Sequence, residues 1–300
     1  MSLIVTGSIG IDSIEAPTGK AENVLGGSCI YFAAGASYFT PVRLVGAVGE
    51  DFPEEHVHTF KQFDIDLEGL ERRKGSKTFR WHGKYHENMN DRDTVDVELN
   101  VLAEDFPPVP ESYKDSKYIF LANTHPAAQK SLLDSFPQRE LVVADTMNLW
   151  IENELGALKD LLREIDGLVL NDGEAFQLTD QPNVVRAAEA ILGMGPKFVV
   201  IKKGEHGAFM LHEDGMAALP AYAARDVVDP TGAGDSFAGG MMGHLAQSGD
   251  LSVQNLRRAM AYGTIVASYN IEAFSLRRLR EIDREQIDQR YKAYSEMLVV

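Results

Sequence analysis

Short apolar runs that end in glycine or a polar residue recur along the chain, and each is typical of a buried strand. They are "SLIVTGSIGI" (2–11), "VRLVGAVG" (42–49), "YIFLAN" (118–123), "LVVADT" (141–146), "GLVLND" (167–172) and "KFVVIKKG" (197–204). Helix-like segments lie at 148–165, 183–192, 235–247 and 252–271. Strands that alternate with helices predict βαβ units, so we expect an α/β fold with a mainly parallel sheet covered on both faces.

The polar residues that end these runs are candidates for a binding site. Ligands of open parallel sheets gather at the carboxyl ends of the strands. Asp145, Asn171 and Asp172 stand at such ends.

A different pattern occupies residues 79–102. Polar and apolar positions alternate in two arms, which flank the polar turn "ENMNDRD". The polar positions are Arg80, His82, Lys84 and His86 in the first arm and Asp96 and Glu98 in the second, and the apolar ones are Trp81, Tyr85, Val95, Val97, Leu99 and Val101. Period two predicts an antiparallel hairpin outside the parallel sheet, with a basic row opposite an acidic row and an apolar second face.

Composition and charge narrow the class of protein. The 300 residues suit one large α/β domain or two smaller ones, but no linker is long enough to separate two domains. The net charge of −16 argues against non-specific binding to nucleic acid or to an anionic membrane. The single cysteine excludes a disulfide framework, and neither a signal peptide nor an apolar run of membrane-spanning length is evident. We therefore expect a cytoplasmic enzyme.

The stretch "DPTGAGDSFAGG" (229–240) carries the strongest chemical signal. Pro230 ends the preceding strand, and the glycines that follow permit positive φ and close approach of a ligand. The backbone N–H groups of residues 232–235 would then point out of a helix start and favour an anion. Asp235 at that place makes sense as the base for a hydroxyl that attacks phosphorus. The alternative is a helix cap after a glycine-rich turn, which a bare "GAGD" would favour.

This stretch closely resembles the signature of the ribokinase-like carbohydrate kinases, the phosphofructokinase B type. Further matches follow in order: "GSIGID" (7–12), "GGSCIYFAAG" (26–35), "LVGAVGED" (44–51), "NDGEA" (171–175) and "KKGEHGA" (202–208). The resemblance covers nearly the whole chain. It implies a single domain over 1–300, folded as a three-layer αβα sandwich with a small β-sheet lid built from about 12–25 and 79–102.

The resemblance also implies ATP as donor, Mg²⁺ and a hydroxymethyl acceptor. Asp235 is then the catalytic base, and the anion hole is formed by Gly232, Ala233 and Gly234. Asn171 and Glu174 organise Mg²⁺ and phosphate, with Glu174 holding the ion through water, as suits an ion that retains waters. "NDGEA" alone would equally suit a helix N-cap.

The nucleotide side follows from the "KKGEHGA" match. Lys203, Gly204 and Gly207 would border the adenine nucleotide, although the two glycines would equally suit a hairpin turn. In several relatives K⁺ binds beside the anion hole, which makes Asp229 and Thr231 candidate K⁺ ligands here.

On the acceptor side, the resemblance gives Asp12 the role of binding acceptor hydroxyls, and Gly26 and Gly27 let the acceptor approach the backbone. An exposed Asp and a tight turn are the alternative. Many members place Asn four residues after the second glycine, where this chain has Tyr31. The acceptor therefore cannot be copied from ribokinase, and Tyr31 predicts a more aromatic pocket.

These observations favour an ATP-dependent kinase that phosphorylates a primary hydroxyl of a sugar. A nucleoside kinase similar to adenosine kinase is the first alternative, and a non-catalytic sugar-binding protein on the same scaffold is the second. The apolar face of the hairpin must be covered, either by the acceptor site or by the lid of a second subunit, so a homodimer through the lid is an open possibility.

Overall fold

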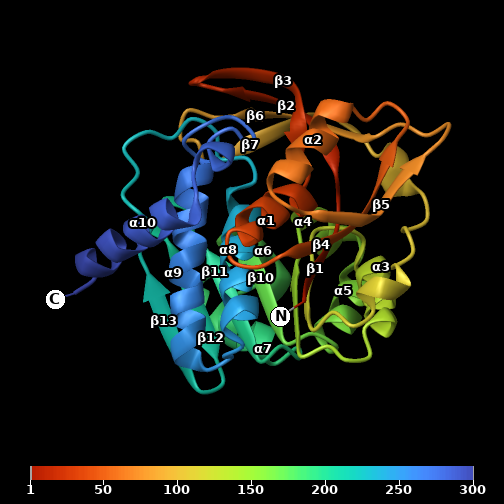
Figure 1. Cartoon of the computed structure of the whole chain (residues 1–300). Coiled ribbons are helices and arrows are strands. Elements are labelled where there is room, and N and C mark those ends of the chain that lie inside the picture. The colour runs from red at the N-terminus through yellow and green to blue at the C-terminus, as the bar shows by residue number, and fades with distance from the viewer. Residues whose placement is uncertain (1, 300) are drawn as a thin grey trace.

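The computed structural model describes residues 2–299, and a nine-stranded sheet forms its centre (Figure 1). The strand order is β13-β12-β11-β10-β9-β8-β1-β4-β5. These strands are β1 (Leu3–Thr6), β4 (Val42–Gly49), β5 (Asp66–Arg73), β8 (Tyr118–Leu121), β9 (Leu141–Asp145), β10 (Gly167–Asn171), β11 (Phe198–Lys202), β12 (Ala208–His212) and β13 (Gly215–Leu219).

Seven neighbouring strands of this sheet, from β11 to β5, run parallel, and β12 and β13 pair antiparallel at one edge. The apolar runs predicted as strands are buried, as expected for a sheet covered on both faces. The predicted α/β fold with a mainly parallel sheet is therefore confirmed.

Helices cover the two faces of the sheet and enclose two cores (Figure 1). The first core includes residues of α1 (Ser28–Ser37), α8 (Ala233–Ser248), α9 (Val253–Asn270) and α10 (Arg284–Met297), and α2 (Glu54–Gln62) contributes Phe60. The second core includes residues of α3 (Pro126–Leu132), α4 (Asn148–Asn153), α5 (Leu155–Leu162), α6 (Asp172–Thr179) and α7 (Val184–Leu192). No helix of the described chain is long and apolar enough to cross a membrane.

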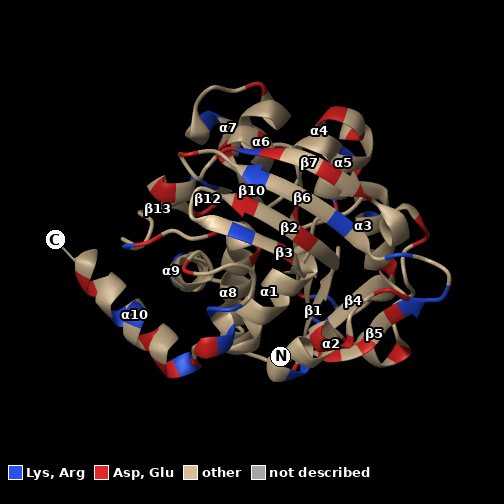
Figure 2. Ribbon diagram, turned by 90° about the horizontal axis from the view of Figure 1, so that it is seen from above, with Lys and Arg blue, Asp and Glu red and all other residues tan. Residues whose placement is uncertain are grey.

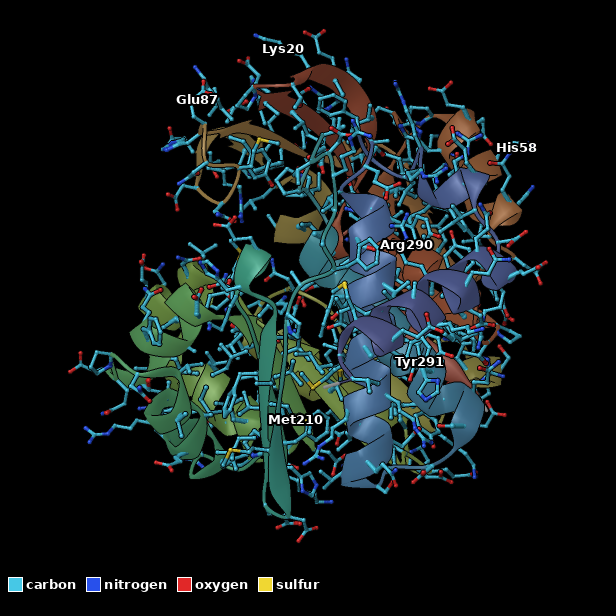
Figure 3. All side chains as sticks on the ribbon, turned by 90° about the vertical axis from the view of Figure 1, so that its left-hand side faces the viewer. Lys20, His58, Glu87, Met210, Arg290 and Tyr291 are labelled. Atoms are coloured by element: carbon cyan, nitrogen blue, oxygen red, sulfur yellow. The ribbon has the colours of Figure 1, made fainter. Side chains whose placement is uncertain are left out.

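A separate four-stranded sheet, here called the small sheet, has the order β3-β2-β6-β7. Its strands are β2 (Gly10–Ala16), β3 (Gly19–Gly26), β6 (Phe79–Tyr85) and β7 (Arg92–Glu98). Seen from above, these strands lie side by side and carry both acidic and basic residues (Figure 2). Lys20 and Glu87 point outward at the top of Figure 3.

The antiparallel hairpin predicted at 79–102 is formed by β6 and β7. Arg80 pairs with Glu98 and His82 with Asp96, so the basic and acidic rows do lie opposite each other. Two contacts of the basic row nevertheless leave the hairpin, since Arg80 contacts Asp51 and His82 contacts Glu15. His86 instead contacts Asp93 of β7 at 2.9 Å.

The apolar face of the hairpin also differs from the prediction. Val101 leaves the strand for a 3₁₀ turn (Asn100–Ala103) and is buried there. Tyr85 is buried as well, whereas the side chains of β7 are exposed.

Two predicted elements are divided in the structure. The first apolar run, expected as one strand, forms β1 in the large sheet and β2 in the small sheet, because the chain crosses between them after Thr6. The helix expected over 148–165 is split into α4 and α5 at Glu154, whose φ of −131° is not helical.

Candidate active site

The turn before α8 has the shape that an anion site needs. Gly232 is the N-cap residue of α8 and has φ of 74°, a left-handed conformation that favours glycine. A Cβ atom on Gly232 would lie 2.2 Å from Cγ of Tyr31, so the ring packs directly behind the turn. The N–H of Ala233 donates to the carbonyl of Pro230 at 3.1 Å, so this amide is engaged within the turn and is not the free donor that we predicted. The anion site then depends on the other first-turn amides, since a helix start leaves its N–H groups without intrahelical partners.

Asp235 lies in the first turn of α8, where its carboxyl group is half-buried. Burial raises the pKa of Asp235 to about 6, Glu174 adds to the rise, and the positive charges of Lys202 and Arg92 oppose it. A carboxylate with a pKa near the working pH is well suited to general base catalysis.

Lys202 is a site residue that the sequence analysis missed. It ends β11, and a Cβ atom on Gly234 would lie 2.7 Å from the Lys202 Nζ, which places this ammonium group beside the anion turn. The neighbouring Lys203, which we predicted instead, donates its backbone N–H to the carbonyl of Gly207 at 2.7 Å. Lys202 is the last residue of β11 and reaches the site, whereas Lys203 lies in the turn that follows the strand.

Asp145 at the end of β9 is a second residue whose role was not predicted. Its carboxyl group is buried, and burial followed by the negative charge of Asp235 raises the Asp145 pKa well above its usual range. The carboxyl groups of Asp145 and Asp235 lie close enough to interact, and Oδ1 of Asp145 has no partner among the described residues. The ends of three adjacent strands, β9, β10 and β11, thus supply Asp145, Asn171 and Lys202 to one place.

Asn171 and Glu174 form a capping box at the start of α6. Oδ1 of Asn171 accepts from the N–H of Glu174 at 2.8 Å, and Oε2 of Glu174 accepts from the N–H of Asn171 at 2.8 Å. The structure therefore contains the helix cap that the sequence analysis offered as the alternative. The cap uses only Oε2 of Glu174, so Oε1 can still bind a ligand. Burial raises the pKa of the Glu174 carboxyl, and the charge of Lys202 opposes this rise.

The two glycines of "KKGEHGA" have positive φ, 52° at Gly204 and 86° at Gly207. A Cβ atom on Gly207 would lie 2.0 Å from the carbonyl oxygen of Leu219, so this glycine is required by close packing of β13. A Cβ atom on Gly204 would lie 2.9 Å from Oδ1 of Asn90 in the β6–β7 turn. The small sheet therefore contacts the predicted nucleotide turn.

Asp12 lies within β2, beside the double glycine that was predicted to accompany it. A Cβ atom on Gly26 would lie 1.9 Å from Oδ2 of Asp12, and the N–H of Gly27 hydrogen-bonds to the Asp12 carboxyl. Gly27 has φ of 100° and also packs against the carbonyl of Ser8. Burial, followed by the charges of Asp229 and Asp235, raises the pKa of Asp12 to about 8. Asp12 is therefore buried, not exposed, and its Oδ1 lacks a partner among the described residues.

Tyr31 does not line an open pocket. The side chain is buried behind Gly232, and its hydroxyl lies near Ser275 and Asp229. Our interpretation of Tyr31 as an aromatic wall for the acceptor is therefore replaced by a supporting position behind the anion turn.

Asp229 is fully buried beneath the same turn. Oδ1 accepts from the N–H of Thr231 at 2.9 Å, and Oδ2 accepts from the N–H of Ser275 at 3.2 Å. Burial raises the pKa of Asp229 despite these hydrogen bonds. Thr231 is held on two further sides, because its carbonyl accepts from Nδ2 of Asn270 at 2.8 Å and its hydroxyl donates to Tyr85 at 3.1 Å.

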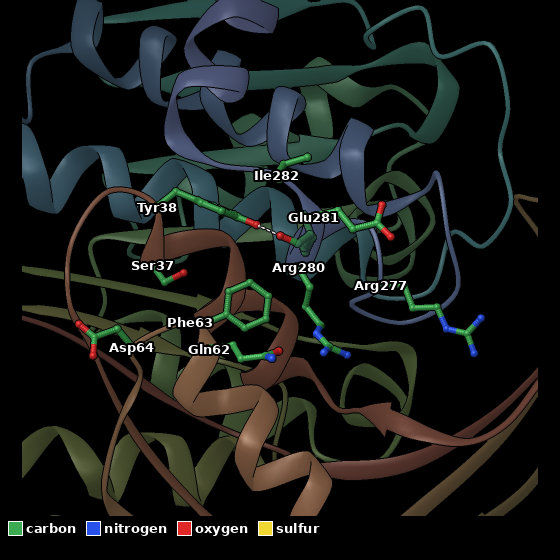
Figure 4. Close-up of a pocket in the computed structure, with 10 residues that line it drawn as sticks. Ser37, Tyr38, Gln62, Phe63, Asp64, Arg277, Arg280, Glu281 and Ile282 are labelled. Atoms are coloured by element: carbon green, nitrogen blue, oxygen red, sulfur yellow. Dashed lines mark hydrogen bonds between the residues drawn. The ribbon is translucent and has the colours of Figure 1, made fainter.

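A surface pocket of about 730 Å³ lies apart from these residues (Figure 4). It is lined by the ends of α1 and α2 and by the segment before α10, including Phe63, Arg277 and Arg280. The hydroxyl of Tyr38 donates to the carbonyl of Leu279 at this pocket (Figure 4). None of the predicted site residues lines it.

Comparison with known proteins identifies the family of this chain. The model of the pfkB family carbohydrate kinases matches residues 12–279. A cytidine kinase of Thermococcus kodakarensis is 31% identical over 249 residues, which cover 81% of this chain and 87% of the relative.

Two solved structures share the fold of this chain. A Methanocaldococcus jannaschii nucleoside kinase has a TM-score of 0.78 at 19% identity and covers 98% of this chain and 99% of its own. A ribokinase II of E. coli in complex with ATP and Mg²⁺ has a TM-score of 0.77 at 18% identity, with coverage of 97% and 99%. The family match spans most of the chain, so this protein belongs to the pfkB family of carbohydrate kinases.

Proposed function

We propose that this protein transfers the γ-phosphoryl group of ATP to the primary hydroxyl of a nucleoside. The observation that carries the proposal is the position of Asp235, a half-buried carboxylate with a pKa of about 6 at the helix start. Asp235 takes the proton of the hydroxyl, the oxygen bonds to the γ-phosphorus, and the bond from phosphorus to ADP breaks.

Lys202 and the first-turn amides of α8 act on the charge of the transferred group. The ammonium of Lys202 lies beside Gly234, so it would contact phosphoryl oxygens held above the turn. Fixed positive charge and aligned N–H groups stabilise a phosphoryl group during transfer without having to reorganise. Gly204 and Gly207 border the nucleotide in this proposal, with Lys203 at the edge of the same turn.

The donor set near Asp235 fits Mg²⁺. Oδ1 of Asp145 has no partner among the described residues, and Oε1 of Glu174 is not used by the capping box. Mg²⁺ prefers oxygen ligands and keeps several of its waters, so carboxylate groups can hold it through those waters. Bound Mg²⁺ would neutralise phosphate charge, and Asp145, Glu174 and Asn171 are the residues that would hold its hydrated form.

Asp12 is the residue that we assign to the acceptor. Its buried carboxyl has an unpartnered oxygen and lies near Asp229 and Asp235, where an acceptor hydroxyl could complete the hydrogen bonding. The sequence favoured a sugar first and a nucleoside second. We now place the nucleoside first, because the cytidine kinase relative matches over most of both chains. A free sugar remains the second candidate, supported by the Staphylococcus aureus ribokinase, which is 29% identical over 38% of this chain.

The test is ADP formation from ATP and Mg²⁺ with a panel of nucleosides and free sugars. We expect cytidine or another nucleoside to be phosphorylated at the primary hydroxyl, as determined by NMR of the product. Turnover with sugars alone would favour the second candidate. Binding of acceptors without any ADP formation would instead support the non-catalytic alternative.

A homodimer through the small sheet is a further part of the proposal. The edge strand β7 exposes Val95 (54%) and Val97 (48%), and Leu99 (48%) follows it. An exposed apolar edge strand readily pairs with another chain. Light scattering should give a dimer for the wild type and a monomer for Val97→Lys. A monomeric wild type would remove the dimer from the proposal.

We also propose that K⁺ binds near Asp229 and Thr231. Burial raises the pKa of Asp229, whose carboxyl accepts from two backbone amides but forms no ion pair with any described residue. A monovalent cation would offset its charge. Equal turnover in potassium chloride and in tetramethylammonium chloride would contradict K⁺ binding at this position. The cytoplasmic location stays a prediction from the sequence.

A further inference from the structure

A β-bulge in the small sheet changes which residues of β7 face the active site. Trp81 pairs with Val97 and His82 with Asp96, but the next residue, Gly83, pairs with Thr94. Val95 is therefore the extra residue of the bulge. A bulge shifts the alternation of side chains by one position.

Because of this shift, Arg92 shares a face with Trp81 and Tyr85. Arg92 is the register partner of Tyr85, and paired residues of adjacent strands project to the same side. Two contacts agree with this assignment. Nε1 of Trp81 donates to Oγ1 of Thr94 at 3.3 Å, and the guanidinium carbon of Arg92 lies 5.8 Å from the centre of the Trp81 ring.

This face of the small sheet looks toward the anion turn. The hydroxyl of Tyr85 accepts from Oγ1 of Thr231 at 3.1 Å. At the tip of the same hairpin, Nδ2 of Asn90 lies 3.5 Å from Oε1 of Glu205, next to Gly204. The hairpin is thus anchored at both the turn before α8 and the predicted nucleotide turn. Arg92 lies close to both anchors, because it is two residues after Asn90 and is the register partner of Tyr85.

Arg92 carries a positive charge on this face of the hairpin that no carboxylate neutralises by direct contact. The arginine of the neighbouring strand, Arg80, pairs with Asp51, whereas Arg92 makes no ion pair with any described residue. Its charge still reaches the site, because it lowers the pKa of both Asp235 and Glu174. A guanidinium group presents a planar fork of donors that matches phosphate oxygens.

We propose that Arg92 contacts the γ-phosphate of the nucleotide donor from the small sheet and stabilises the phosphoryl group during its transfer. Arg92 would then oppose Lys202, which approaches from the large sheet. The small sheet is in this view a lid that completes the site electrostatically as well as covering it. The inference rests on the proposed phosphoryl transfer from ATP.

The kinetic test compares Arg92→Met with Lys84→Met. Lys84 is exposed, lies one residue before Tyr85 and pairs with Asp93, so it projects from the opposite face of the hairpin. Loss of an arginine that contacts the transferred group should lower kcat by about 100-fold or more. Arg92→Lys should fall between the wild type and Arg92→Met, because lysine keeps the charge but not the fork. Lys84→Met should retain wild-type turnover.

Two further readouts separate a phosphate contact from a structural role. Guanidinium chloride at low concentration should partly restore the turnover of Arg92→Ala but not that of Asp235→Asn. Calorimetry without acceptor should show ATP binding to Arg92→Met weakened about tenfold, with AMP binding unchanged. If the wild type phosphorylates no acceptor, the proposed function fails, and the calorimetry still decides the role of Arg92.

The inference is overturned if Arg92→Met and Lys84→Met have equal turnover, or if ATP affinity is unchanged by Arg92→Met. A change confined to the acceptor KM would also overturn it, because Arg92 would then act on the acceptor.

Discussion

The hydroxyl of Thr231 donates to the hydroxyl of Tyr85 at 3.1 Å and so joins the turn before α8 to the small sheet. The same threonine is tied to α9 through Asn270 and to Asp229 through its backbone N–H. The anion turn is therefore held between the large sheet's helices and the small sheet. Movement of the small sheet would therefore displace the residues that we assign to phosphoryl transfer.

Tyr85→Phe removes this bond and keeps the ring. We expect the free energy of unfolding to fall by about 0.5–1.5 kcal/mol, as for loss of one hydrogen bond, and the acceptor KM to rise. Urea denaturation and initial-rate kinetics measure the two effects. Tyr262→Phe is the matched control, because the Tyr262 hydroxyl donates to Oδ1 of Asp288 at 3.2 Å, between α9 and α10 and not at any residue that we assign to the site. It should lose comparable stability with unchanged KM, and equal KM values for both variants would refute a link to the site.

Asp235→Asn should bind ATP like the wild type but lose about 10²–10⁴-fold in kcat, the usual contribution of a general base. The wild-type kcat/KM should rise with pH, reach half of its plateau near pH 6 and then level off, because the base acts in its ionised form and its pKa is about 6. Rate profiles from pH 5 to 8 test both expectations. Near-native turnover of the variant would exclude Asp235 as the base.

The sequence predicted the chemistry of the anion turn but not its surroundings. The string around Asp235 is local, so its glycines and its acid could be interpreted without the rest of the fold. Lys202 and Lys203 are adjacent, and which of them reaches the site depends on where β11 ends. The end of a strand is set by the whole sheet and not by the local sequence. Asp145 was placed at a strand end, but its contact with Asp235 depends on how α8 packs against the sheet.

Arg92 and the divided first strand show a second limit of sequence interpretation. Strict alternation from Val97 would put Val95 and Asp93 on the face of the hairpin that carries Trp81 and Tyr85. The bulge at Val95 puts Arg92 on that face instead of Asp93. Residues 3–11 are buried throughout, and burial alone does not tell that the two halves of this run join different sheets.

Glu174→Gln should raise the Mg²⁺ concentration needed for half-maximal turnover. Glutamine can still accept the hydrogen bond from the N–H of Asn171, so the cap of α6 is kept while the charge near the phosphates is lost. A magnesium titration measures the change, and thermal unfolding checks that the helix cap is intact. An identical titration curve for the two proteins would remove Glu174 from metal binding.

Asp12→Asn should stabilise the protein while weakening acceptor binding. The pKa of Asp12 is about 8 in the folded state and near 3.9 when unfolded, so the folded state holds the proton more tightly. This raised pKa favours folding below pH 4, and its contribution is lost as the pH rises toward 8. The melting temperature of Asp12→Asn should therefore exceed that of the wild type more at pH 8 than at pH 5. A pH-independent difference would contradict the shift.

Lys202→Met and Lys203→Met form a pair that tests the site against the sequence. Nζ of Lys202 lies beside Gly234, and its charge acts on Asp145, Glu174 and Asp235. Loss of this cation removes stabilisation of the transferred phosphoryl group, so kcat should fall by about 10²-fold. It also raises the pKa of Asp235, so the rise of kcat/KM should move to higher pH. Lys203→Met should keep kcat and the pH profile, because its backbone and not its side chain forms the turn. Initial rates over pH 5–9 measure both, and a larger loss in Lys203→Met would restore the lysine that the motif alone favoured.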